Sequence, residues 1–337
     1  MLKEANYGEV LNMKNYIMID LRTPAEYFGS TIPEAVNLPI LTNEEREIIG
    51  KTYKQNIDEA KALAIEFVGP RLHIIYKKLR KLSSGKLIVV FCARGGLRSR
   101  VLAYTMAAMG LPIIKLDLGY KGYRNYVLGH IEEILDKVTF VTLFGKTGSG
   151  KTEIIKSLKS LGADTLDLEG CANHRGSIMG SIGLEKCNSQ KQFENNVFDS
   201  LIKRKSDLVF TEGESKRIGG IVMGNKLFEK TRAGINVGIE SPIGFRVLNI
   251  KNDYLKAENL DGEILAALSK LEKYIPKKNI SGYKESILKK DYDEVIERLM
   301  LEYYDLNYKS INNNFENKYY NINNLETAKK LIGDFIR

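Results

Sequence analysis

Residues 138–152 have the sequence VTFVTLFGKTGSGKT, an apolar run followed at once by a glycine-rich loop with the spacing G-x4-G-K-T. Glycines in such a loop let backbone N–H groups face phosphate oxygens, while Lys151 reaches the terminal phosphate and Thr152 can hold a Mg²⁺ ion. A strand before the loop and a helix after it predict a parallel α/β sheet with the loop at a strand's carboxyl end. The predicted phosphate-binding residues are Gly145, Gly148, Ser149, Gly150, Lys151 and Thr152.

A second strand-and-loop unit, LIVVFCARGGLR, occupies residues 87–98. A thiol reacts as its thiolate, which backbone N–H groups at a strand-to-helix turn stabilise, so Cys92 is predicted to be catalytic. The two glycines of the loop let its backbone form an anion-binding nest, and the two arginines add positive charge. An inert buried cysteine is the alternative, and this loop composition argues against it. The predicted anion-binding residues are Arg94, Gly95, Gly96 and Arg98.

Short apolar strands alternate with helical patterns through the first 250 residues. Strands are predicted at 16–20, 87–91, 113–116, 138–144, 165–168, 208–211 and 235–239, and helices at 42–68, 71–82, 98–109, 151–161 and 190–205. This alternation predicts two parallel α/β domains, 1–130 and 131–250, with residues 125–137 as the linker. Strand patterns fade after residue 250, which indicates a helical C-terminal region, 251–337, packed on the second domain.

The composition is that of a soluble globular protein, with 43% hydrophobic and 28% charged residues. The net charge is +9, and the surplus lies before residue 251. A basic excess favours a polyanionic partner such as RNA, and it also fits small anionic substrates. Three widely spaced cysteines form neither a disulfide framework nor a metal cluster, which suits a reducing cytoplasm. No signal peptide or membrane span is expected, because the longest apolar runs are far shorter than about 20 residues.

Further candidates follow the predicted strands of the second domain. Glu212 and Glu214 come directly after a strand, where a metal-side carboxylate would lie, although a solvated acidic loop fits equally well. Asn173, His174 and Arg175 form a polar cluster, in which the last two can bind a phosphate or an RNA backbone. An isolated histidine is more often structural than catalytic. No metal ligand set is assigned.

The Cys-x5-Arg spacing occurs in cysteine phosphatases and in rhodaneses, and flanking motifs separate these families. Three segments resemble rhodanese motifs: IDLRTPAEY at 19–27, GSTIPEAVNLP at 29–39 and LGYKGYR at 118–124. A phosphatase would have histidine in place of Phe91, and it would need a general acid that the sequence does not offer. The resemblance covers residues 17–124 and implies a rhodanese-like α/β domain in which Cys92 carries sulfur or selenium.

A rhodanese-like domain ahead of a P-loop domain resembles the bacterial tRNA 2-selenouridine synthase family. The motifs that carry the resemblance are CARGGLRS at 92–99, ANHRGS at 172–177 and EGESKRIG at 212–219. The last motif adds Arg217 to the candidate site residues. Ala93 stands where the family usually has tryptophan.

This resemblance implies a transferase that replaces sulfur by selenium in the wobble 5-substituted 2-thiouridine of tRNA. Geranyl diphosphate would first alkylate the sulfur, with its diphosphate in the P-loop, and selenophosphate would then supply selenium through the Cys92 loop. An alkylated sulfur leaves as a thiol once selenium attacks the carbon. No tightly bound cofactor is expected beyond a Mg²⁺ ion at Thr152.

Two other functions remain open. The P-loop domain would be an ATPase or kinase if the rhodanese-like domain were a regulatory sulfur carrier, and ATP consumption without tRNA would support this. An inactive rhodanese fold that binds another protein is the second alternative. Cys92 argues against it, because such a module needs no thiol in a cationic loop.

Overall fold

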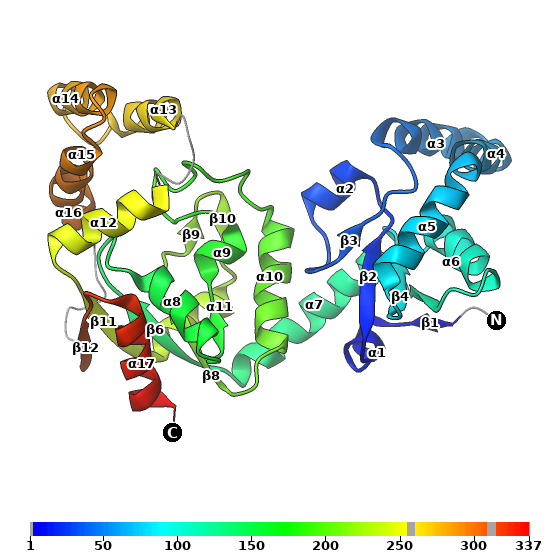
Figure 1. Cartoon of the computed structure of the whole chain (residues 1–337), viewed down its shortest axis with the longest axis horizontal. Coiled ribbons are helices and arrows are strands. Elements are labelled where there is room, and N and C mark those ends of the chain that lie inside the picture. The colour runs from blue at the N-terminus through cyan, green and yellow to red at the C-terminus, as the bar shows by residue number, and fades with distance from the viewer. Residues whose placement is uncertain (1–2, 255–259, 309–314, 337) are drawn as a thin grey trace. The chain divides into compact units, whose positions relative to one another are not determined.

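The computed structural model describes residues 3–254, 260–308 and 315–336, and it divides into two compact units, residues 1–131 and 132–337 (Figure 1). Each unit is built on a five-stranded sheet in which all strand pairs are parallel. The parallel α/β class predicted from the sequence is therefore confirmed. In the described parts of the chain, no helix is both long enough and apolar enough to cross a membrane.

The sheet of unit 1 has the strand order β1-β5-β4-β2-β3. Its strands are β1 (Glu4–Ala5), β2 (Tyr16–Asp20), β3 (Val36–Asn37), β4 (Leu87–Phe91) and β5 (Ile113–Leu116). Its helices are α1 (Tyr7–Leu11), α2 (Pro24–Gly29), α3 (Asn43–Gln55), α4 (Ile57–Val68), α5 (Leu72–Ser83) and α6 (Leu97–Ala108), with a 3-10 turn at Gly69–Arg71. Helix α7 (Gly119–Asp136) begins in unit 1 and ends in unit 2, within the segment 125–137 that was predicted as the linker. Because β4 is the central strand, the Cys92 loop lies at the middle of the sheet's carboxyl edge.

The helix predicted at 42–68 is two helices, α3 and α4, separated at Asn56. Asn56 has extended backbone dihedrals, and its side-chain oxygen accepts hydrogen bonds from the N–H groups of Asp58 and Glu59. Asparagine favours this capping position over a helix interior, because its short side chain competes for backbone donors. The charged pattern on either side is continuous, which hides the break in the sequence.

The sheet of unit 2 has the order β12-β11-β6-β8-β7. Its strands are β6 (Thr139–Phe144), β7 (Thr165–Leu166), β8 (Leu208–Glu212), β11 (Ile235–Glu240) and β12 (Asn317–Tyr320), and β9 (Arg217–Ile218) pairs with β10 (Ile221–Val222) in a separate antiparallel ladder. Buried side chains of β6, β8 and β11 pack with those of α8 and α17 in one core. The central position of β6 places the phosphate-binding loop at the middle of the carboxyl edge.

The helices of unit 2 are α8 (Lys151–Ser160), α9 (Leu168–Ala172), α10 (Gln190–Ile202), α11 (Asn225–Ala233), α12 (Ile243–Tyr254), α13 (Asp261–Leu271), α14 (Lys277–Leu288), α15 (Tyr292–Leu299), α16 (Asp305–Asn307) and α17 (Asn324–Phe335), with a π-helical turn at Met300–Tyr304. Helices α13 to α15 form their own apolar cluster, and Figure 1 shows them beside α12, away from the sheet. The strand predicted at 165–168 ends at Leu166, because the Asp167 side chain accepts from the Gly170 N–H at 2.6 Å and caps α9.

Strands β1, β3, β9, β10 and β12 were not expected from the sequence, and the longest of them is β12. It pairs in parallel with β11, with Val237 opposite Asn317 and Glu240 opposite Tyr320. Its side chains alternate between half-buried and exposed, as an edge strand allows. A strand of this kind lacks the continuous apolar run by which buried parallel strands are recognised.

Candidate active site

The phosphate-binding loop connects β6 to α8, as the sequence predicts. Gly148 and Gly150 have φ values of +78° and +89°, in the left-handed region that glycine adopts without strain. A Cβ atom at Gly148 would lie 2.7 Å from the backbone oxygen of Arg246, so close packing also requires glycine there. Lys151 Nζ donates to the Gly145 carbonyl at 2.7 Å, which holds the ammonium group against the loop.

Three side chains from later in unit 2 donate hydrogen bonds to backbone carbonyls of this loop. The pairs are Arg246 Nε to Thr147 O at 2.8 Å, Asn249 Nδ2 to Gly148 O at 2.9 Å and Asn321 Nδ2 to Ser149 O at 2.7 Å. Arg246 is buried and forms a two-pronged ion pair with Asp305, at 2.6 and 2.9 Å. Because side chains outside the loop take up its carbonyl oxygens, the loop is favoured in a conformation whose N–H groups can face an anion.

Two glutamates lie beside the first turn of α8. Thr152 Oγ1 donates to Glu169 Oε2 at 3.1 Å, and the Glu169 N–H donates to Glu212 Oε1 at 3.0 Å. Burial, followed by the charge of Glu214, raises the pKa of Glu169 to about 8. Burial, followed by the charge of Asp167, also raises the pKa of Glu212. Buried carboxyl groups this close are stabilised by protons or by a cation.

Glu169 is absent from the residues predicted from sequence. It follows β7 by three residues, and β7 lies next to β8 at the same sheet edge as Glu212. An acid near the end of a strand was therefore the available signal. Short strands such as β7 make this signal weak, because their ends are hard to locate from sequence.

These residues fit a Mg²⁺ ion bound together with a phosphate ligand. Glu212 is fully buried, and its Oε2 atom accepts no hydrogen bond from the described residues. Within those residues, no group of three or more His, Cys, Asp or Glu side chains is arranged to hold a metal. Mg²⁺ commonly uses few protein ligands and completes its shell with water and substrate phosphates. Thr152 and the nearby carboxylates would hold it on the protein side.

Asn173 and His174 follow α9. Asn173 ends that helix with φ +49°, and its side chain donates to the carbonyls of Glu185 and Lys186, so it fixes the local chain. A Cβ atom at Gly219 would lie 2.7 Å from the His174 ring, which shows how closely the two segments pack. Burial, followed by the charge of Arg175, lowers the pKa of His174. Its Nδ1 atom is buried and has no hydrogen-bond partner in the described parts of the chain.

Arg175 donates hydrogen bonds to the segment that follows it and to helix α12. Its guanidinium donates to the carbonyls of Ile182 and Asp253, both at 2.7 Å, and stacks 4.5 Å above the ring of Tyr254. These contacts tie the ANHRGS motif to α12.

Glu214 and Arg217 lie in different surroundings. A Cβ atom at Gly176 would lie 2.7 Å from Glu214 Oε2 and 3.3 Å from Glu169 Oε1, so the ANHRGS motif covers both carboxyl groups. Burial raises the pKa of Glu214, and the charge of Lys151 opposes this. Arg217 is exposed on β9. Glu214 therefore lies with Glu169 and Glu212, whereas Arg217 lies at the surface.

Cys92 begins the turn between β4 and α6, and only 3% of its surface is exposed. Its Sγ atom lies 3.1 Å from Ser99 Oγ, a neighbour that the sequence analysis did not single out. Gly95 has φ +63°, and a Cβ atom there would lie 2.9 Å from the backbone nitrogen of Leu118. The LGYKGYR motif therefore packs directly on this loop. All three cysteines are free thiols.

Arg98 does not lie unpartnered in the loop. Its two terminal nitrogens donate to the carboxylate of Glu26, at 2.7 and 3.1 Å. Burial alone would raise the pKa of Glu26, and the hydrogen bond and charge of Arg98 outweigh it and hold the pKa below its ordinary value. Glu26 belongs to the IDLRTPAEY motif, so the motif and the loop meet through this pair. Arg94 is exposed on the same turn.

Comparison with known proteins gives two family matches. The family described as "tRNA 2-selenouridine synthase AAA domain" matches residues 138–333, and the rhodanese-like domain family matches residues 6–126. A protein named tRNA 2-selenouridine synthase from Nitrosomonas eutropha is 33% identical over 71% of this chain, and one from Shewanella frigidimarina is 31% identical over 77%. The matched regions span 63% and 71% of those relatives' own lengths.

A solved structure titled as the N-terminal domain of a putative ATP/GTP binding protein from Clostridium difficile 630 is also similar. It is 33% identical, and the match covers 37% of this chain and 99% of that one. The TM-score is 0.37, which is too low to support any conclusion.

Proposed function

Because the chain belongs to the tRNA 2-selenouridine synthase family, we propose that it replaces sulfur by selenium in the wobble 2-thiouridine of tRNA. The observation that supports this most directly is the presence of two different glycine-rich loops, each directly after the central strand of its sheet. One holds the buried thiol of Cys92, and the other holds Lys151 and Thr152. A nucleotide hydrolase needs only the second loop and a sulfur carrier only the first, whereas exchange through an alkylated intermediate uses both.

The P-loop would bind the diphosphate of geranyl diphosphate in the alkylation step. The sulfur of the base attacks the first carbon of the geranyl group, the carbon–oxygen bond breaks, and diphosphate leaves with the electron pair. Loop amides and Lys151 stabilise the negative charge that develops on the leaving group. A Mg²⁺ ion beside Thr152 and Glu169 would supply further neutralising charge.

The Cys92 loop would bind the phosphate group of selenophosphate in the selenation step. The phosphorus–selenium bond breaks as water oxygen reaches phosphorus, selenium bonds to the ring carbon, and geranylthiol leaves, with no change of oxidation state. Arg98 has five N–H donors and uses two on Glu26, so it can contact the phosphate without leaving that carboxylate. Cys92 would act in this step as a thiolate beside the phosphorus–selenium bond, without itself bonding to selenium.

The partner in this proposal is the anticodon region of tRNA, and the place of action is the cytoplasm. The positive charge surplus lies before residue 251, in the segment that contains both loops. Lys and Arg side chains there would supply phosphate contacts that position the tRNA, and such contacts weaken as salt rises.

The test is mass spectrometry of nucleosides after the full chain is incubated with 2-thiouridine tRNA. Geranyl diphosphate and selenophosphate are added singly and together. A geranylated nucleoside with the first donor, and a selenium nucleoside only with both, would support the two-step proposal. An unchanged nucleoside under every condition, together with ATP hydrolysis in the absence of tRNA, would instead favour the ATPase alternative.

A further inference from the structure

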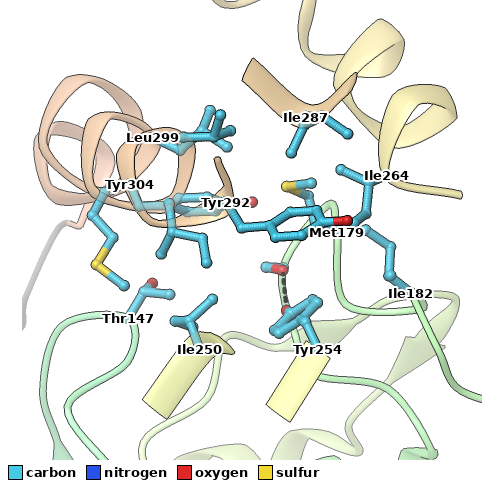
Figure 2. A pocket seen from close by; sticks show the side chains of 14 residues that line it. Thr147, Met179, Ile182, Ile250, Tyr254, Ile264, Ile287, Tyr292, Leu299 and Tyr304 are labelled. Carbon is cyan, nitrogen blue, oxygen red and sulfur yellow. Dashed lines mark hydrogen bonds between the residues drawn. The ribbon is translucent and has the colours of Figure 1, made fainter. Parts of the chain in front are cut away.

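An apolar pocket lies between the phosphate-binding loop and helices α12 to α15 (Figure 2). Thr147 brings the loop to its wall, and Met179 brings the segment after the ANHRGS motif. Figure 2 shows Ile250 and Tyr254 of α12 on one side, facing α14 and α15 on the other. The pocket therefore joins both motifs of unit 2 to the C-terminal helices.

The pocket wall touches the phosphate-binding loop directly. A Cβ atom at Gly148 would lie 3.0 Å from Met300 Cε and 3.1 Å from Ile250 Cγ1, and both of those side chains line the pocket. An apolar group in the pocket would therefore lie within van der Waals reach of the loop proposed to bind phosphate. One ligand with an anionic end and an apolar tail can occupy both places.

The pocket wall has few polar side-chain atoms: those of Ser177, Tyr254 and Tyr292 are engaged with protein, and Tyr304 Oη is buried without a hydrogen-bond partner in the described residues. Ser177 Oγ lies 3.3 Å from Tyr254 Oη, and Tyr292 Oη donates to Asp261 Oδ1 at 2.6 Å. Burial raises the pKa of Tyr254 to about 12, so its hydroxyl stays neutral. A nucleobase placed here would leave several donors and acceptors without partners, which is costly in a buried site. A hydrocarbon chain has no such requirement.

The pocket differs from the closed core that surrounds it. Leu268 and Leu271 of the same apolar cluster are fully buried, whereas the pocket-lining Ile250, Met179 and Ile296 are only half-buried. A core closed on all sides cannot admit a ligand without unfolding, and partial exposure of the wall gives an entry route.

We propose that this pocket binds the hydrocarbon tail of a prenyl diphosphate whose diphosphate occupies the P-loop. The inference rests on the proposed alkylation step, and it adds the surface that selects an apolar tail over a nucleobase. Burial of each methylene favours binding, so affinity rises with chain length while the pocket has room.

The test is calorimetry on the full chain with Mg²⁺ and four ligands: inorganic pyrophosphate, ADP, dimethylallyl diphosphate and geranyl diphosphate. We expect geranyl diphosphate to bind at least about tenfold more tightly than dimethylallyl diphosphate, from the apolar carbons added. The gain in binding affinity over pyrophosphate should be smaller for ADP than for geranyl diphosphate. Equal affinity for pyrophosphate and geranyl diphosphate would overturn the inference.

Two pocket-filling variants from opposite walls, Ile296→Phe and Met179→Phe, locate the tail. We expect each to lose most of the gain from the geranyl tail and to keep wild-type affinity for pyrophosphate, which reports an intact loop. Leu288→Phe, at a position that is 69% exposed on α14, is the matched control and should change neither affinity.

The outcomes separate this inference from the proposed function. Wild-type affinity for geranyl diphosphate in both filled variants would mean that the tail lies elsewhere, and alkylation would remain supported if geranylated tRNA still forms. Failure of the wild-type protein to bind even pyrophosphate would overturn both.

Discussion

Replacing Glu169 by glutamine should change how the stability of unit 2 depends on pH. The carboxyl group of Glu169 has a pKa of about 8 in the folded chain, against 4.5 for an ordinary glutamate, because it is buried and lies near Glu214. Its ionisation is therefore more costly in the folded state than in the unfolded state. The penalty is absent below pH 4.5, grows as pH rises, and is complete above pH 8. A neutral glutamine avoids it at every pH and can still accept the Thr152 hydrogen bond.

The size of the effect follows from the pKa difference. Each pKa unit corresponds to about 1.4 kcal/mol, so the penalty reaches about 4 kcal/mol near pH 7.5. For a unit of this size, 1 kcal/mol shifts Tm by roughly 2–4 °C, which makes the expected difference about 10 °C. The Glu169→Gln variant should thus match the wild type near pH 4.5 and exceed it increasingly toward pH 8.

The assay is thermal unfolding of the full chain between pH 4.5 and 8. The transition of unit 2 is identified by its response to Mg²⁺ and pyrophosphate. Glu229→Gln, at an exposed position of α11, is the matched control and should leave the pH profile of Tm unchanged. Parallel pH profiles for wild type and Glu169→Gln would refute the reasoning. Saturating Mg²⁺ and pyrophosphate should reduce the difference, because a cation stabilises the ionised carboxylate.

Three further predictions concern the two loops. Cys92→Ser should abolish the selenium product and leave the geranylated nucleoside, because a serine hydroxyl is not ionised near neutral pH. The control is Cys187→Ser. Selenouridine formed at the normal rate by Cys92→Ser would contradict the assignment. Lys151→Ala should weaken pyrophosphate binding by at least about tenfold, because it removes a charge-assisted contact, and calorimetry showing unchanged affinity would exclude this role. Asp305→Asn should destabilise unit 2 by about 3 kcal/mol, because it leaves the buried Arg246 without its countercharge; a denaturant midpoint equal to that of the wild type would rule this out.

Local sequence was sufficient wherever one continuous segment forms the feature. The strands β4 and β6 are apolar throughout because both faces of a parallel sheet are covered, and that run is visible without any tertiary information. The glycines of the two loops are required by backbone conformation alone, as the positive φ values of Gly95, Gly148 and Gly150 show. Both loops therefore lie directly after apolar strands, as predicted, and the strand order of each sheet makes those strands central.

Single residues limited the prediction of element ends. Asn56 divides one predicted helix into two, and Asp167 ends a predicted strand early, because each caps a helix with its side chain. The edge strand β12 was missed because its alternating pattern is weak and its Asn-rich surroundings indicate a loop. These are local effects whose outcome depends on competition between neighbouring structures.

The sequence by itself determined the fold class, the thiol loop and the phosphate-binding loop, because each depends on contacts within one strand, turn and helix. Only the tertiary structure decided what surrounds them. Asn321 donates to the Ser149 carbonyl from 172 residues away in the sequence, and Arg246 donates to the Thr147 carbonyl from 99 residues away. The pocket beside Gly148 is lined by residues that range from Thr147 to Tyr304. Such partners are brought together by the order of strands in the sheet, and no local periodicity specifies that order.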